Sequence, residues 1–160
     1  FGSRWWGWPF NVRPVYYWNQ EIITDHSGWQ AKIYLTGNPL LWWLVFFGVL
    51  AAFAQGFFRS RDNTLKPAFL WLVAAYLVNL LPFIFIGRIS FLYHYLPSLL
   101  FGLLILSLWL DQLWPKYRKL LLAIFLLLFL NFLLLTPLVY GWPLPALLSD
   151  WLAKLMLFFR

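Results

Sequence analysis

A short polar segment between two long apolar runs carries the side chains best suited to chemistry. It covers residues 87–97 and holds Arg88 together with Tyr93, His94 and Tyr95. An arginine guanidinium binds a phosphate through two parallel hydrogen bonds, and phenol and imidazole groups donate or accept further ones. The segment is therefore a candidate site for a phosphate-bearing ligand. The alternative is a turn whose aromatic rings anchor the chain at a membrane surface while the arginine reaches toward water.

A second cluster of similar character lies nearer the N-terminus, in residues 8–18. Arg13 precedes the rigid Pro14 there and is surrounded by tryptophan and tyrosine residues. The guanidinium group of Arg13 could hold an anionic ligand. A cation–π contact with a neighbouring ring explains the same pattern equally well, so both interpretations stay open.

The rest of the sequence offers little for catalysis or metal binding. It contains no glycine-rich phosphate loop, no set of His and Cys with metal-ligand spacing and no Ser-His-Asp arrangement. Among only five acidic residues, Glu21 and Asp25 are interpreted as part of a solvated face. Gln55, Asn79 and Asn131 lie within apolar runs, where amides usually form hydrogen bonds between helices. No catalytic residue, metal site or cofactor is predicted within the chain.

The composition indicates an integral membrane protein. Hydrophobic residues make up 63% of the chain, charged residues 11%, and the mean hydropathy is +0.74. A typical soluble domain is about 45–50% apolar and about 25% charged. The formal net charge of +7 arises mostly from loops between apolar runs, where basic residues set membrane topology. Nucleic acid is therefore not predicted as a partner.

Four apolar runs are each long enough for a membrane-spanning helix, which needs about 20 residues. They cover residues 39–58, 67–86, 97–113 and 120–139. The predicted fold class is an all-α membrane protein with a four-helix transmembrane domain over residues 39–139. Residues 1–38 are predicted to be an aromatic interfacial segment with one or two short helices on the outer face, and residues 140–160 a C-terminal interfacial tail with an amphipathic helix.

The charges of the connecting loops predict how the helices are oriented. Basic residues concentrate in the loops after the first and third runs, as Arg59, Arg61, Lys66, Lys116, Arg118 and Lys119. Short basic loops stay on the cytoplasmic side of a membrane. Residues 1–38, the loop around residues 87–95 and the C-terminal tail are therefore predicted to share the outer, or lumenal, side.

Three strings of the sequence resemble the C-terminal four-transmembrane region of the protein O-mannosyltransferase family. They are Trp8-Pro9 with Arg13-Pro14-Val15-Tyr16-Tyr17, then Ile33 to Trp43, and then Arg88 to Pro97. Their order and spacing match along essentially the whole chain. The resemblance implies a membrane glycosyltransferase of the GT-C type. Such enzymes move mannose from a polyprenyl-phosphate mannose to Ser or Thr hydroxyls of proteins at the outer or lumenal face, with inversion of the anomeric centre.

The resemblance also implies what lies outside this chain. In this family the catalytic acidic residue belongs to the N-terminal half of the enzyme. The chain begins with Phe1 and its only methionine is Met156, so it is expected to be the C-terminal part of a longer protein. The expected partners are membrane lipid, the polyprenyl-phosphate-mannose donor, a secreted or membrane protein acceptor and the missing N-terminal half. The candidates for binding the donor phosphate or lipid are Arg13, Arg88, Tyr93, His94 and Tyr95.

Several alternatives remain open at this stage. A related polyprenyl-phosphate-sugar transferase would use a different sugar or acceptor. A non-enzymatic membrane scaffold, a transporter subunit or a lone interfacial binding module would bind no sugar lipid for transfer. The expected localisation is a multi-pass integral membrane protein, in the plasma membrane of a prokaryote, which is favoured, or in the endoplasmic reticulum membrane of a eukaryote.

Overall fold

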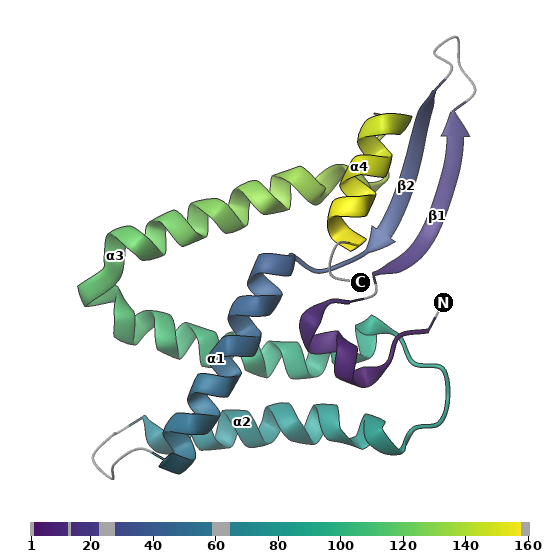
Figure 1. Cartoon of the computed structure of the whole chain (residues 1–160). Coiled ribbons are helices and arrows are strands. Elements are labelled where there is room, and N and C mark those ends of the chain that lie inside the picture. The colour runs from purple at the N-terminus through teal and green to yellow at the C-terminus, as the bar shows by residue number, and fades with distance from the viewer. Residues whose placement is uncertain (1, 13, 23–27, 59–64, 158–160) are drawn as a thin grey trace.

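The computed structural model describes residues 2–12, 14–22, 28–58 and 65–157 of the chain. These residues are mostly helical, with a small antiparallel sheet at one end (Figure 1). In chain order the elements are η1 (Trp5–Phe10), β1 (Val15–Ile22), β2 (Trp29–Leu35), α1 (Pro39–Phe58), α2 (Lys66–Leu80), η2 (Leu81–Phe85), η3 (Leu92–Tyr95), α3 (Leu96–Tyr140), β3 (Leu144–Pro145) and α4 (Ala146–Leu157).

The first two apolar runs form helices close to the predicted bounds. Helix α1 begins at Pro39, and the side chain of Asn38 caps it by accepting a hydrogen bond from the Leu41 N–H at 3.3 Å. Helix α2 passes directly into the 3-10 helix η2, which has Pro82 in its first turn. Two helical stretches of the described residues, 66–85 and 92–140, are long and apolar enough to cross a membrane, and residues 39–55 form a shorter apolar helix.

The third and fourth predicted helices are joined in one bent helix. Helix α3 contains 45 residues, and its only non-helical backbone angles are at Tyr117, with φ −121° and ψ 25°. Pro115, two residues earlier, cannot donate a helical hydrogen bond and crowds the preceding turn. The chain folds back on itself at this point (Figure 1), so two helical halves meet at a sharp kink at Tyr117, close to the place where the sequence predicts a connection.

The N-terminal segment corrects the prediction of an all-α chain. Residues 5–10 form a short 3-10 helix, but β1 and β2 pair as an antiparallel hairpin, and β3 adds a short third strand. Valine, isoleucine and aromatic side chains in these strands favour extended backbone. The sequence analysis interprets the same aromatic residues as anchors at a membrane surface and therefore predicts short helices instead of strands. A register shift between Tyr16 and Trp18 bulges β1.

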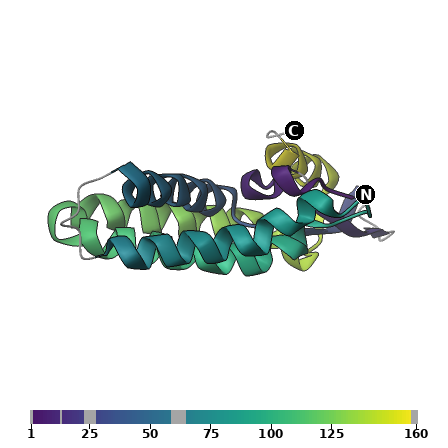
Figure 2. The ribbon, with the colours of Figure 1, turned by 90° about the horizontal axis from the view of Figure 1, so that it is seen from below.

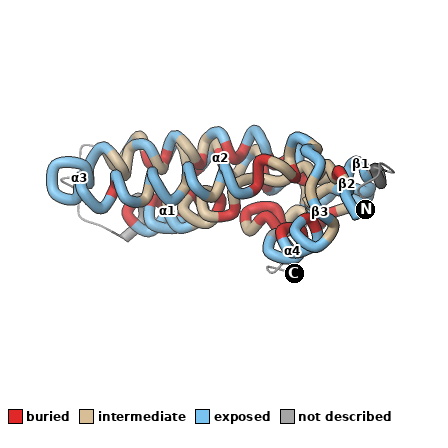
Figure 3. The backbone as a smooth tube through the Cα atoms, turned by 90° about the horizontal axis from the view of Figure 1, so that it is seen from above, coloured by how far each residue is buried: buried red, intermediate tan, exposed pale blue. Residues whose placement is uncertain are grey.

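The largest core lies between α1, α2 and the first half of α3. Figure 2 shows these helices side by side. Figure 3 marks their buried positions, which belong to one hydrophobic cluster between them. Gly102 of α3 lies directly against the side chain of Val45 and near the ring of Tyr76, because it has no side chain of its own. Small residues at a crossing let membrane helices approach closely. Trp8 of η1 and Tyr95 of η3 close the core at one end and are both fully buried.

The elements gather at two opposite ends of the bundle. The bend of α3, the end of α1 and the start of α2 lie at one end (Figure 1). The sheet, η1, the loop before η3 and helix α4 lie at the other end. The segments predicted to share one side of the membrane are therefore together in space, and which end faces outward stays a prediction.

Candidate functional site

The N-terminal segment is fixed to the bundle through Trp8. The Ser3 N–H donates a hydrogen bond to the Ser90 carbonyl at 2.8 Å, which attaches the segment to the loop before η3. The Trp8 indole N–H donates to the Ser3 hydroxyl at 2.7 Å, and the Trp42 indole N–H donates to the Trp8 carbonyl at 2.9 Å. Both of these bonds are buried. The position of residues 3–8 is therefore set by the loop on one side and by helix α1 on the other.

His94 lies in an aromatic stack beside Trp8. Its ring is 4.3 Å from the ring of Tyr93, 5.4 Å from that of Phe83 and 6.0 Å from that of Trp8, measured between centroids. Its Nδ1 atom is 3.2 Å from the backbone nitrogen of Phe91 and 3.0 Å from the carbonyl oxygen of the same residue. Depending on its tautomer, Nδ1 accepts from the first or donates to the second. The imidazole is thus held by both packing and a local cap, and Nε2 is its other polar atom.

The two tyrosines that flank His94 have different surroundings. Tyr93 is 43% exposed and stacks on His94 and on Phe91. Tyr95 is fully buried, and its hydroxyl lies 2.9 Å from the hydroxyl of Tyr76 on helix α2. The structure therefore brings Tyr93 and His94 together near the surface and directs Tyr95 into the helix bundle.

An open cleft of about 470 Å³ lies between the N-terminal segment and the loop before η3. Arg4 and Arg88 both line it, together with Ser3, Ser90 and apolar residues from η1, η2 and the loop. Both arginines are exposed, and neither has an acidic partner within 4 Å among the described residues. Two unpaired guanidinium groups on one cleft form a site suited to an anion, and a phosphate matches their donor geometry.

Arg4 belongs to this cleft although the sequence analysis did not single it out. Arg4 and Arg88 are far apart in the sequence, and their segments are brought side by side by the backbone bond between Ser3 and Ser90 and by the stacking of Trp8 on His94. Arg13 lies outside the described residues, so its distance from the cleft stays open. No three His, Cys, Asp or Glu residues lie together as a metal site within the described part of the chain.

The Gly37-Asn38-Pro39 string has a structural explanation. A side chain on Gly37 would occupy the space of the Trp42 ring. The Asn38 amide donates to the Leu128 carbonyl in the second half of α3 at 2.9 Å, which ties α1 to that half. Asn11 has a left-handed backbone (φ 53°), and its amide donates to the Thr36 hydroxyl and the Gly37 carbonyl at 3.0 and 3.1 Å. These residues hold the joint between the sheet, η1 and the bundle.

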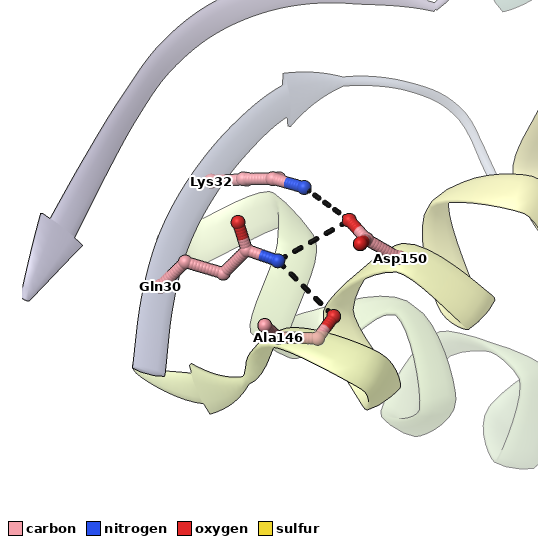
Figure 4. Close-up of polar contacts among 4 residues, drawn as sticks. All are labelled: Gln30, Lys32, Ala146 and Asp150. Carbon is pink, nitrogen blue, oxygen red and sulfur yellow. Dashed lines mark hydrogen bonds and ion pairs between the residues drawn. The ribbon is translucent and has the colours of Figure 1, made fainter. Parts of the chain in front are cut away.

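The sheet is attached to helix α4 by a polar cluster on β2. Lys32 forms an ion pair with Asp150 at 2.6 Å, and the Gln30 amide donates to Asp150 and to the Ala146 carbonyl (Figure 4). The hydrogen bond from Lys32 is the main cause of a lowered pKa for the Asp150 carboxyl. Burial raises the pKa of the nearby Tyr34 hydroxyl. The cluster is a structural contact between the two elements.

Comparisons with known proteins match one family over nearly the whole chain. The family model described as the C-terminal four TMM region of protein-O-mannosyltransferase matches residues 1–158. A dolichyl-phosphate-mannose–protein mannosyltransferase 1 of Candida albicans is 33% identical over 113 residues, covering 62% of this chain and 12% of that protein. A protein O-mannosyl-transferase 2 of Danio rerio is 27% identical over 124 residues, covering 68% of this chain and 16% of that protein. No solved structure matches.

The relatives are much longer than this chain. A protein O-mannosyl-transferase 2 of Drosophila pseudoobscura is 27% identical over 192 residues, covering 87% of this chain but only 24% of that protein. These three organisms are eukaryotes, so the plasma membrane of a prokaryote, favoured by the sequence analysis, gains no support from them. All three relatives are named as mannosyltransferases, and none as a scaffold or transporter. The match over nearly the whole length shows that the chain belongs to the protein O-mannosyltransferase family, as its C-terminal four-transmembrane region.

Proposed function

We propose that the chain is the C-terminal membrane part of an enzyme that moves mannose from polyprenyl-phosphate mannose to Ser or Thr hydroxyls of proteins. The observation that carries the proposal is the cleft shared by Arg4 and Arg88, two cations without an acidic partner among the described residues. In this proposal α1, α2 with η2, and the two halves of α3 form four membrane spans. The end that bears the cleft faces the outer or lumenal side.

The cleft would hold the phosphate of the donor lipid. Transfer breaks the bond between the anomeric carbon of mannose and the phosphate oxygen, and the acceptor hydroxyl forms the new bond to that carbon. A carboxylate outside this chain would take the proton of the hydroxyl. The polyprenyl phosphate leaves with increasing negative charge, and the guanidinium groups of Arg4 and Arg88 would stabilise that charge. Apolar residues that line the cleft, such as Phe83 and Ile86, suit the first part of the lipid chain.

The aromatic segment beside the cleft has two roles in this proposal. Tyr93 and His94 do not line the cleft, but the His94 ring lies 5.4 Å from that of Phe83, which does. The exposed Tyr93 hydroxyl and Nε2 of His94 would supply further hydrogen bonds to the donor, since Nδ1 is engaged by the Phe91 backbone. Tyr95 would hold the turn in place through its buried hydroxyl contact with Tyr76. Arg13 stays a candidate on the strength of its motif.

The test removes the two charges from the cleft of the full-length enzyme. Arg4→Gln and Arg88→Gln are each expected to raise the KM for polyprenyl-phosphate mannose about tenfold, because a charge-assisted hydrogen bond at an exposed site contributes about 1.5 kcal/mol. The double variant should lose more than either single variant. Arg88→Lys keeps the charge but not the planar fork, so its KM should fall between wild type and Arg88→Gln.

A matched control lies at the opposite end of the molecule. Arg118 is an exposed arginine at the bend of α3, where its guanidinium lies over the ring of Trp114. Arg118→Gln removes the same charge from the protein but should leave donor KM unchanged. Equal effects of Arg118→Gln and Arg88→Gln would mean that the enzyme responds to net charge rather than to the cleft. Unchanged donor kinetics in the double variant of Arg4 and Arg88 would overturn the proposed phosphate site.

A further inference from the structure

Helix α4 has three distinct faces. Ser149, Leu152 and Ala153 are buried, and Leu152 and Ala153 pack in one cluster with Leu135 and Leu138 of α3. Asp150 lies on a second, polar face, where it pairs with Lys32 of β2. One face therefore joins the bundle and the second joins the sheet, so the orientation of the helix is fixed by the protein itself.

The third face is apolar and exposed. Leu147, Trp151 and Leu155 follow one another at intervals of one helical turn, and Leu148 lies beside them. Leu147 is 88% exposed and Trp151 is 54% exposed. A water-facing helix that already buries one face has no need of a second apolar stripe. The stripe is therefore expected to have an apolar environment of its own.

The place of α4 in the fold indicates what that environment is. The helix follows the end of α3, a helix long and apolar enough to span a membrane, after only the turn at Gly141 and the short strand β3. Tyr140 and Trp142 flank that turn and are both more than half exposed, as expected of rings at a membrane surface. In Figure 1, α4 runs across α2 and obliquely to the second half of α3, the helices long enough to span a membrane, and it is closer to the direction of the shorter α1. If α2 and α3 cross the membrane, α4 therefore lies oblique to them at one end of the bundle.

We propose that the stripe of Leu147, Leu148, Trp151 and Leu155 binds the lipid bilayer at the boundary between headgroups and acyl chains. An interfacial helix inserts its apolar face by about 5–10 Å and keeps its charged residues on the water side. Asp150 and Lys154 flank the stripe and match that pattern. Through Asp150 and Gln30 the helix is joined to the sheet, so lipid binding by α4 would also hold the sheet at the membrane surface. The proposal requires a membrane but does not depend on mannose transfer.

The test uses single cysteines on the different faces of α4. The chain contains no cysteine, so a cysteine placed by Leu148→Cys, Trp151→Cys or Asp150→Cys gives this chain one attachment point for an environment-sensitive fluorophore. Positions 148 and 150 are two residues apart and therefore lie on opposite sides of the helix. The purified protein is placed in lipid nanodiscs, in which a fraction of the lipids carries a doxyl quencher near the headgroup. Iodide serves as the quencher from the aqueous phase. Leu148 is 44% exposed, so its replacement should leave folding intact.

The expected result is a contrast between faces of one helix. Labels at 148 and 151 should be quenched by shallow doxyl lipids at least about twofold more strongly than the label at 150, with the opposite order for iodide. Weaker quenching by lipids labelled deep in the acyl chain would fit an interfacial depth. Iodide quenching at 148 and 151 equal to that at 150 would overturn the proposal in favour of a water-exposed face. Protection of 148 and 151 from both quenchers would overturn it in favour of a protein segment covering the stripe.

Discussion

Replacement of Gly102 by alanine tests whether the close crossing of α1 and α3 sets the stability of the bundle. A methyl group at position 102 would overlap the Cγ1 atom of Val45 and lie 3.5 Å from the ring of Tyr76. Val45 is fully buried in α1. A valine in a helix has one strongly preferred side-chain rotamer, so it cannot turn aside without strain. The two helices would have to separate or Val45 would have to adopt an unfavourable rotamer.

The two opposing effects of this substitution can be compared. Overpacking of a core costs about 1–3 kcal/mol, and the rigid Val45 places this site near the upper end. Alanine is a better helix former than glycine by about 1 kcal/mol, which offsets part of the cost. The free energy of unfolding should therefore fall by about 2 kcal/mol. For a chain of this size the Tm would fall by about 4–8 °C.

The matched control is Gly48→Ala in the middle of α1. A methyl group there would lie 3.7 Å from the nearest atom, on Leu106, which is an ordinary contact. The change in helix propensity is the same, so this variant should keep or slightly raise the Tm. In a Val45→Ala background the cost of Gly102→Ala should disappear, because the overlapping atom is gone. Thermal unfolding of the purified protein in nanodiscs measures all four variants. Equal Tm changes for Gly102→Ala and Gly48→Ala would refute the reasoning.

Two further predictions concern the contacts at the end of the bundle that carries the cleft. Trp42→Phe removes the buried donor to the Trp8 carbonyl and should lower the free energy of unfolding by about 1–3 kcal/mol, measured by chemical unfolding in detergent. The Asp150 carboxyl has a lowered pKa when it pairs with Lys32, so the pairing stabilises the fold above the unfolded pKa of about 3.9 and is lost as pH falls through the lower, folded value. The protection factors of β2 amides, which correct for the intrinsic pH dependence of exchange, should therefore fall below about pH 4 in the wild type, whereas in Asp150→Asn they should be lower at neutral pH and lack this step.

The helical part of the fold could be predicted because its signal is local. Long apolar runs beside Pro39 and Pro67 fix both the type and the start of α1 and α2. The bend in α3 was predicted at the correct place but as a loop, since a run containing Pro115 and three basic residues resembles a connection. The connection is shorter than a loop, because Tyr117 alone departs from helical angles where the two halves meet.

The sheet and the complete cleft could not be predicted from local patterns. The hairpin depends on pairing between β1 and β2 and on the contact of β2 with α4, which joins residues from opposite ends of the chain. Arg4 becomes a cleft residue through contacts between distant segments, such as the bond between Ser3 and Ser90. Asn79 was expected to bond to another helix, but its amide donates to the Ala75 carbonyl of its own helix at 2.8 Å. The sheet and the cleft depend on partners that are distant in the sequence, whereas Asn79 bonds to a neighbour in its own helix instead of the predicted partner in another one.

The residues around the cleft fall into two groups, those that can contact a ligand and those that hold the cleft in place. Arg4 and Arg88 line the cleft and can touch an anion directly. Trp8 and Trp42 lie behind it and connect the cleft to the helix bundle through two buried hydrogen bonds. Because a displaced Trp8 would release the Ser3 hydroxyl from its bond, loss of bundle packing should alter the cleft even when both arginines are intact. Variants of Trp42 should for this reason weaken donor binding and stability together, whereas variants of Arg88 should weaken donor binding alone.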